Sequence, residues 1–326
     1  MHVTNQHDSN QDASHIVKDR ARDKLARDLG PVFMAAFDDV STVEIMLNAD
    51  GRLWQERLGK GMACIGSLRA SQSEAAIKTV AGFYGKEVTR SQPVLESEFP
   101  LDGSRFAAQI PPVVLAPTFA LRKRAVAIFT LDQYVATGVM SGAQRDVLVR
   151  AIGAHRNILV IGGTGSGKTT LVNAIIREMV VSNPQERVFI IEDTGEIQCS
   201  AENFVQYRTS PDISMTTLLR TSLRMRPDRI LVGEVRGPEA LDLLMAWNTG
   251  HEGGAATLHA NDARAGLSRL AMLISMHPDA PTPIEPLIGE AVHVLVHIGR
   301  TPTGRRVQEI VEVDGYENGR YLLRPM

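Results

Sequence analysis

One segment of the chain combines the residue types that bind phosphate groups. Residues 162–169 read GGTGSGKT, which matches the phosphate-loop pattern of a glycine, four further residues and then Gly-Lys-Thr. The glycines let the backbone wrap around a phosphate and point its N–H groups inward. We expect Lys168 to reach the β- and γ-phosphates of a nucleoside triphosphate and the Thr169 hydroxyl to bind Mg²⁺. The expected contact residues are Gly162, Gly163, Thr164, Gly165, Ser166, Gly167, Lys168, Thr169 and Thr170.

The residues on either side of this segment predict the local structure that a phosphate loop requires. Four apolar residues, 158–161, indicate a buried strand, and apolar residues at helical spacing run from Leu171 to Val180. A strand before the loop and a helix after it is the required context, and the start of the helix adds a partial positive charge. A chance glycine-rich turn is therefore the less favoured interpretation.

An acidic segment follows the next apolar run. The sequence IIEDTGE places Glu192, Asp193 and Glu196 directly after a predicted strand, where a parallel sheet carries its ligands. Carboxylates in this position can hold Mg²⁺ through water and orient an attacking water molecule. The alternative is an acidic loop that is merely solvated, because most acidic side chains lie on the surface.

A second acid ends the segment RILVGEVR. This is the form of a Walker B strand, except that the usual aspartate is absent and Glu234 takes the end position. Glu234 is the best candidate for the base that polarises water toward the γ-phosphate. The alternative is a buried acid paired with Arg236. We favour the catalytic interpretation, since phosphoryl transfer needs a second acid at a strand end.

Two histidines bracket a short predicted strand in TGHEGGAATLHAN. His259 follows the strand, in the layer expected to face nucleotide, and is a candidate sensor of the γ-phosphate. His251 precedes the strand and either does the same or holds the glycine-rich turn. A zinc site is not expected, because neither histidine has the spacing to the distant cysteines that such a site needs.

Three arginines of the N-terminal half lie on or near predicted strands: Arg105, Arg122 and Arg124. Each is either an ordinary surface charge or a group that stabilises the charge of a bound triphosphate, from the same chain or from a neighbouring subunit.

The composition excludes several classes of protein. With 44% hydrophobic and 22% charged residues, the chain of 326 residues has the make-up of a globular protein of about two domains. A formal net charge of -2 gives no sign of a surface that binds polyanions, so direct DNA binding is not expected. Two cysteines cannot build a disulfide scaffold or a four-cysteine zinc site. The polar N-terminus and the lack of an apolar run of about 18 residues predict a cytoplasmic protein.

The hydrophobic pattern predicts two domains. Residues 1–14 are polar and without periodicity, and we expect them to be disordered. Residues 15–126 predict a small α+β domain, and residues 127–140 predict a linker. Strands and helices then alternate through 141–326, which indicates an α/β domain with a mostly parallel sheet, ending in antiparallel strands.

Taken together, the phosphate loop, the acidic segment IEDTGEIQ, the tract RPDRILVGEVRGPEA and the histidine segment TGHEGGAATLHAN resemble the ATPases of type II and type IV secretion systems. The likeness is greatest to the TrbB-type conjugal transfer ATPases, and DGSRFAAQIPPV and FALRKRA extend it into the N-terminal half. Type II secretion ATPases carry a four-cysteine zinc element that this chain cannot build. That difference, together with a short C-terminal region, favours the conjugation branch.

The resemblance implies a PAS-like N-terminal domain joined to a RecA-like ATPase domain, with nucleotide between the two and Mg²⁺ as cofactor. Lys168 and Thr169 would carry phosphate and Mg²⁺, Glu196 and Glu234 would position or activate water, and His259, with or without His251, would read the γ-phosphate. Arg105 and either Arg122 or Arg124 would reach the phosphates. Tyr134 would stack on the adenine or pack in the core.

The function that follows is hydrolysis of ATP to ADP and phosphate. As the resemblance implies, hydrolysis would drive conjugative transfer, type IV secretion and pilus assembly by a homohexameric ring at the inner face of the cytoplasmic membrane, in contact with other secretion proteins. One alternative is a nucleotide-dependent assembly switch that docks a coupling protein. Another is a RecA-like motor that translocates DNA, which the net charge disfavours.

Overall fold

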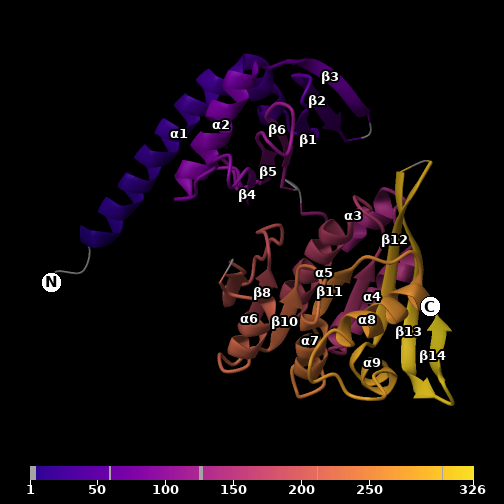
Figure 1. The fold of residues 1–326 in the computed structure, drawn as a ribbon. Coiled ribbons are helices and arrows are strands. Elements are labelled where there is room, and N and C mark those ends of the chain that lie inside the picture. The colour runs from indigo at the N-terminus through magenta and orange to yellow at the C-terminus, as the bar shows by residue number, and fades with distance from the viewer. Residues whose placement is uncertain (1–4, 59, 125–127, 211, 303) are drawn as a thin grey trace. The chain divides into compact units, whose positions relative to one another are not determined.

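A computed structural model of the chain describes residues 5–58, 60–124, 128–210, 212–302 and 304–326. The chain divides into two compact units, Met1–Val126 and Ala127–Met326 (Figure 1). No helix among the described residues is both long enough and apolar enough to cross a membrane.

The first unit is an antiparallel sheet covered by helices. Its six-stranded sheet has the order β3-β2-β1-β6-β5-β4. Phe33 and Phe37 of α1 pack with Phe99, Phe106 and Phe119, and these rings form the centre of the unit's core. The elements are α1 (Asn5–Asp38), β1 (Thr42–Leu47), β2 (Arg52–Arg57), β3 (Gly61–Ser67), α2 (Ala70–Phe83), β4 (Val94–Glu98), β5 (Arg105–Gln109) and β6 (Thr118–Arg122).

The N-terminal helix is longer than the sequence suggests. Disorder is predicted over residues 1–14, but α1 already begins at Asn5; residues 1–4 lie outside the described part of the chain. The helical run also continues past Gly30 and Pro31, residue types that usually end a helix, with a kink at Gly30 (φ 75°). Leu25 and Phe33, on either side of the kink, are buried in the same core. Packing therefore holds both segments, and a helix that is already formed extends at little cost.

The second unit is an eight-stranded sheet with the order β14-β13-β12-β7-β11-β10-β8-β9. The strands from β12 to β9 run parallel, whereas β13 and β14 are antiparallel to their neighbours. The elements are α3 (Leu131–Ala136), α4 (Gly142–Gly153), β7 (Ile158–Ile161), α5 (Lys168–Ser182), β8 (Val188–Glu192), β9 (Phe204–Arg208), α6 (Met215–Ser222), β10 (Arg229–Val232), α7 (Glu239–Trp247), β11 (Ala255–Leu258), α8 (Ala263–Ile274), α9 (Glu285–Ala291), β12 (Val294–Thr301), β13 (Gly304–Glu317) and β14 (Arg320–Pro325).

Helices cover both faces of this sheet, as the alternation of strands and helices predicts. Successive residues of β7 belong to different cores: Ile158 packs with residues of α4 and α5, and Leu159 packs with residues of α6, α7, α8 and α9. All four residues of β7 are buried. The strand that leads into the phosphate loop therefore lies in the middle of the unit, which gives the loop a rigid base.

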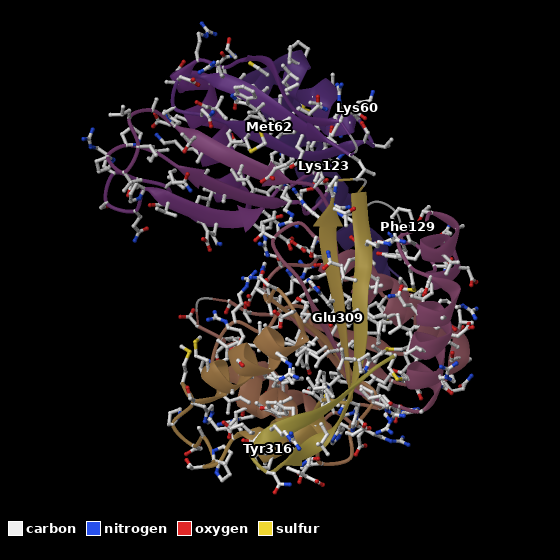
Figure 2. The ribbon with its side chains drawn as sticks, turned by 90° about the vertical axis from the view of Figure 1, so that its right-hand side faces the viewer. Lys60, Met62, Lys123, Phe129, Glu309 and Tyr316 are labelled. Atoms are coloured by element: carbon white, nitrogen blue, oxygen red, sulfur yellow. The ribbon has the colours of Figure 1, made fainter. Side chains whose placement is uncertain are left out.

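Residues 128–140, most of the stretch predicted to be a linker, pack within the second unit; residue 127 lies outside the described part of the chain. Thr130 caps α3, as its sequence suggests, but the buried residues Leu131, Tyr134 and Met140 belong to a core of the second unit. Phe129, which is labelled in Figure 2, packs edge-on against Tyr134, with ring centroids 6.1 Å apart. The apolar side chains of this segment explain why it packs instead of linking: each one buried adds hydrophobic stabilisation that an exposed linker would lose.

Candidate nucleotide site

The phosphate loop joins the carboxyl end of β7 to the start of α5. Gly165 has φ 66° and Gly167 has φ 100°, both in the left-handed region that favours glycine. Lys168 is the first residue of α5, so the backbone N–H groups at the start of this helix lie beside the loop. Thr170 lies in the same first turn. The local structure is the one that the sequence predicts.

Lys168 is folded back onto its own loop. The side chain is only 7% exposed, and Nζ donates hydrogen bonds to the carbonyl oxygens of Gly162 (2.9 Å) and Gly163 (3.0 Å). Nζ also lies 3.4 Å from the ring nitrogens of His259. The lysine and the histidine that the sequence assigns to phosphate are thus neighbours, although 91 positions separate them in the chain.

One polar group in the loop has no partner. The hydroxyl of Ser166 is buried, and it makes no hydrogen bond within the described residues. An unsatisfied buried hydroxyl costs on the order of 1–3 kcal/mol. A bound phosphate oxygen would supply the missing partner, so this orphaned group fits an anion-binding loop.

The acidic segment after β8 reaches the loop through Glu196. Thr169 Oγ1 donates to Glu196 Oε2 at 3.3 Å. Asn173 of α5 fixes the segment: its amide nitrogen donates to the carbonyl of Glu196 (3.4 Å), and its amide oxygen accepts from the N–H of Gln198 (3.1 Å). A hydroxyl beside a carboxylate is an oxygen pair that suits Mg²⁺. Among the described residues, no three or more His, Cys, Asp or Glu side chains are grouped so that they could hold a metal ion.

Glu192, another acid predicted to hold Mg²⁺ through water, is buried, and both its oxygens have partners within the protein. It is 2% exposed, and Oε2 accepts hydrogen bonds from the backbone N–H groups of Glu196 (2.8 Å) and Ile197 (3.0 Å). Oε1 accepts from the side chain of Gln206. Burial raises the pKa of Glu192 to about 6. Because both oxygens are engaged inside the protein, we interpret Glu192 as the residue that shapes the loop bearing Glu196.

Glu234 lies between a histidine and an arginine. Its Oε1 is 2.6 Å from His259 Nε2, and its Oε2 accepts from Arg236 Nε at 2.8 Å. Arg236 also pairs with Asp193, at 3.2 Å, and Asp193 in turn accepts from Thr209 at 2.9 Å. The pairing with Arg236 that the sequence offers as an alternative is therefore present. Asp193, one of the acids predicted to hold Mg²⁺ through water, faces this arginine, and its oxygens contact Arg236 and Thr209.

Two further predicted contact residues are His251 and Tyr134. His251 precedes β11, and the phosphate loop follows β7; because β11 and β7 run parallel and in register, the two are at opposite ends of the sheet. His251 is thus separated from the phosphate loop of its own chain, a position that cannot be read from sequence spacing alone. Tyr134 is 7% exposed and packs in the core, the second of the two roles that the sequence allows.

The N-terminal arginines are neighbours within the first unit. Arg105 and Arg122 lie directly opposite each other on β5 and β6, and Arg122 also faces Glu44 on β1. Arg124 pairs with Glu98 at 3.3 Å. Like charges directly opposite in an antiparallel pair repel each other. The carboxylates of Glu44 and Glu98 offset part of that repulsion.

Three residues beside the loop carry no sequence motif. Asn173, described above, is one; Arg300 and Arg305 are the others, and the Nε atoms of both donate to the carbonyl oxygen of Gly165, at 3.1 and 3.2 Å. They are 135 and 140 positions from that glycine, so no local pattern could have revealed them. The one signal in the sequence is the closeness of Arg300, Arg305 and Arg306 to one another along the chain.

Comparison with known proteins shows the family to which the chain belongs. The family described as "Type II/IV secretion system protein" matches residues 62–307. A probable conjugal transfer protein TrbB of Sinorhizobium fredii is 49% identical over 298 residues, which cover 91% of each chain.

Solved structures show the same fold. The VirB11 ATPase of the Brucella suis type IV secretion system, solved with sulphate, is similar with a TM-score of 0.50 and 27% identity, over 90% of this chain and 97% of that one. The ATPase DotB of Legionella pneumophila has a TM-score of 0.63 at 22% identity, over 86% of this chain and 81% of that one. The α/β fold with mixed strand directions is therefore that of these ATPases, and the chain belongs to the type II/IV secretion ATPase family.

Proposed function

We propose that the chain hydrolyses ATP to ADP and phosphate and that this reaction drives conjugative transfer or type IV secretion, including pilus assembly. The observation that carries the proposal is the convergence of Lys168, Glu234 and His259 at the edge of the sheet that bears the phosphate loop. Three separate segments bring a cation, an acid and a histidine to one place. Phosphoryl transfer requires such groups to bind the phosphates and to position the attacking water.

Each of these side chains has a role that follows from its contacts. Lys168 exchanges the carbonyl oxygens of Gly162 and Gly163 for the β- and γ-phosphates. His259, in contact with both Lys168 and Glu234, reads the presence of the γ-phosphate. Oε2 of Glu234 is held by Arg236, so Oε1 is the oxygen that takes the proton of the attacking water.

Thr169 and Glu196 hold Mg²⁺ in this proposal, the ion neutralising charge on the phosphates when bound. Glu196 also orients the attacking water. Glu192 and Asn173 keep Glu196 in place through the backbone of the acidic segment.

The proposal extends to the whole chain. The second unit is a RecA-like ATPase domain and the first a PAS-like domain, whose Arg105 and either Arg122 or Arg124 reach the phosphates. The working form is a homohexameric ring at the cytoplasmic face of the inner membrane that acts with other secretion proteins and does not bind DNA directly. Measuring the particle mass with and without a non-hydrolysable ATP analogue and Mg²⁺ tests the ring; a monomer under every condition contradicts it.

Two substitutions test the chemistry. Lys168→Ala should abolish both nucleotide binding and turnover. Glu234→Gln should bind ATP with little change but hydrolyse it about 10²–10⁴-fold more slowly, the usual contribution of a general base. Glu202→Gln, an exposed acid of the same unit, is the matched control and should behave as the wild type. Normal turnover in Glu234→Gln would rule out its role as base.

A further inference from the structure

A C-terminal hairpin forms one wall of the phosphate loop. Strand β12 pairs in parallel with β7, and β12 and β13 form the long hairpin that carries the label Glu309 in Figure 2. Arg300 on β12 and Arg305 on β13 are direct cross-strand partners. Their Nε atoms converge on a single acceptor, the carbonyl oxygen of Gly165, at 3.1 and 3.2 Å.

The hairpin and the loop are in close contact at three glycines. A methyl group on Gly165 would overlap the guanidinium of Arg300, and one on Gly162 would overlap the carbonyl of Ile298. A methyl group on Gly167 would stand 3.1 Å from Arg305 Cδ. The loop therefore packs directly against the hairpin at these glycines. A movement of the loop toward the hairpin would have to displace it, so the hairpin limits which loop conformations are available.

The two arginines form an arrangement that is unfavourable by itself. Two cations placed directly opposite in an antiparallel pair repel each other. In the part of the chain that the structure describes, Arg300 forms no ion pair with a carboxylate. The charge of a bound phosphate group would offset this repulsion more strongly than the neutral carbonyl oxygen of Gly165 does.

The shared acceptor also affects the peptide that follows it. The carbonyl of Gly165 belongs to the same peptide group as the N–H of Ser166, and hydrogen bonds in series polarise one another. Two charged donors on the oxygen fix the orientation of this peptide and make its N–H a stronger donor. Phosphate loops bind anions through such N–H groups.

We propose that Arg300 and Arg305 are positioning residues of the phosphate loop: they hold the Gly165 carbonyl away from the ligand and add two positive charges that favour the phosphate groups of a nucleotide. This inference rests on the proposed function, because the ligand is taken to be a nucleoside triphosphate. It adds that two residues of the C-terminal hairpin set the affinity of the phosphate loop for nucleotide.

The experiment measures the dissociation constant of a fluorescent ATP analogue with Mg²⁺, using the full chain at several salt concentrations. Arg300→Gln and Arg305→Gln should each weaken binding about tenfold, the effect of losing one charge-assisted hydrogen bond. The double variant should also show a shallower dependence of affinity on salt, since two of the charges that attract the phosphates are gone. A merely structural role would leave this salt slope unchanged.

Arg306→Gln is the matched control, because it removes the same charge from the adjacent position, which pairs with Gly299. Arg300→Lys and Arg305→Lys keep the charge and should retain most of the salt slope. They also test the inference if a glutamine variant does not fold. Wild-type affinity and salt slope in the double variant, alongside loss of binding in Lys168→Ala, would overturn the inference and leave the proposed function intact. A wild-type chain that binds no nucleotide would overturn both.

Discussion

The buried carboxylate of Glu192 makes the stability of the second unit depend on pH. This side chain is 2% exposed, and burial raises its pKa from the ordinary value of 4.5 to about 6. Hydrogen bonds from Ile197, Gln206 and Glu196 act in the opposite direction, but they do not overcome the loss of hydration. Replacing Glu192 by glutamine keeps the size of the side chain and removes its titration.

The sign of the effect follows from proton binding. Between pH 4.5 and about 6 the folded protein retains the proton of Glu192, whereas the unfolded chain has released it. The free energy of unfolding therefore falls as the pH rises through this window and stays lower above it. The separation of the two pKa values corresponds to a loss of ~2 kcal/mol. For a unit of this size, that is a shift of roughly 4–8 °C in melting temperature.

The assay is urea unfolding of the full chain at pH 4.5 to 8, for the wild type and Glu192→Gln. Trp247 is fully buried in the second unit, so a Trp54→Phe background lets its fluorescence report that unit alone. The quantity of interest is the wild-type free energy of unfolding minus that of the variant, in which other titrating groups cancel. It should fall by ~2 kcal/mol toward neutral pH.

A constant offset between the two proteins is expected, since glutamine changes the hydrogen bond to Gln206, and this offset does not vary with pH. Glu202→Gln, at an exposed site, should give a flat difference. A flat difference for Glu192→Gln as well would mean that the carboxyl titrates normally, and the account of its burial would then be wrong.

Three further predictions concern side chains around the site. Asn173→Ala removes the amide that bonds to the carbonyl of Glu196 and to the N–H of Gln198, so it should lower turnover at least tenfold in a steady-state ATPase assay while the chain remains folded. Arg229 is fully buried and donates to Glu186 and to the carbonyls of Ile152 and Gly253. Arg229→Met should cost about 3–5 kcal/mol in a denaturation experiment, because Glu186 loses its buried partner and keeps only the pairing with His155 among those described. Tyr134→Phe should leave nucleotide affinity unchanged in a titration, since the ring packs in the core; a tenfold loss would mean that the phenol contacts the ligand.

The sequence predicts those parts of the fold where one residue type dominates. The apolar runs that become β7, β8 and β10 are fully buried strands, and such runs are readable because parallel strands are covered on both faces. Strand β9 escapes prediction because it is an edge strand of mixed residues that is only partly buried. Strand β3 contains two glycines and is largely exposed, so it lacks the alternation that marks a half-buried strand.

The candidate site likewise has parts that the sequence predicts and parts that it does not. The phosphate loop, Glu196, Glu234 and His259 are predicted from local motifs, and the structure brings them together. A sequence motif does not predict which groups surround each of its residues in the folded protein. Glu192 and Glu196 look alike in the sequence, yet one faces two backbone N–H groups and the other faces Thr169. Arg300 and Arg305 reach the loop only because β12 pairs with β7, a contact between distant segments.

The folded-back position of Lys168 has a thermodynamic consequence. Its ammonium group already has two carbonyl acceptors before any ligand arrives. Nucleotide binding is therefore an exchange, in which phosphate oxygens replace the oxygens of Gly162 and Gly163, and the heat released is the difference between two sets of hydrogen bonds. Calorimetry should accordingly give a smaller binding enthalpy than a count of the final phosphate contacts suggests. The same exchange protects the empty loop, because an ammonium group that is already paired does not have to remain buried without a partner between successive nucleotides.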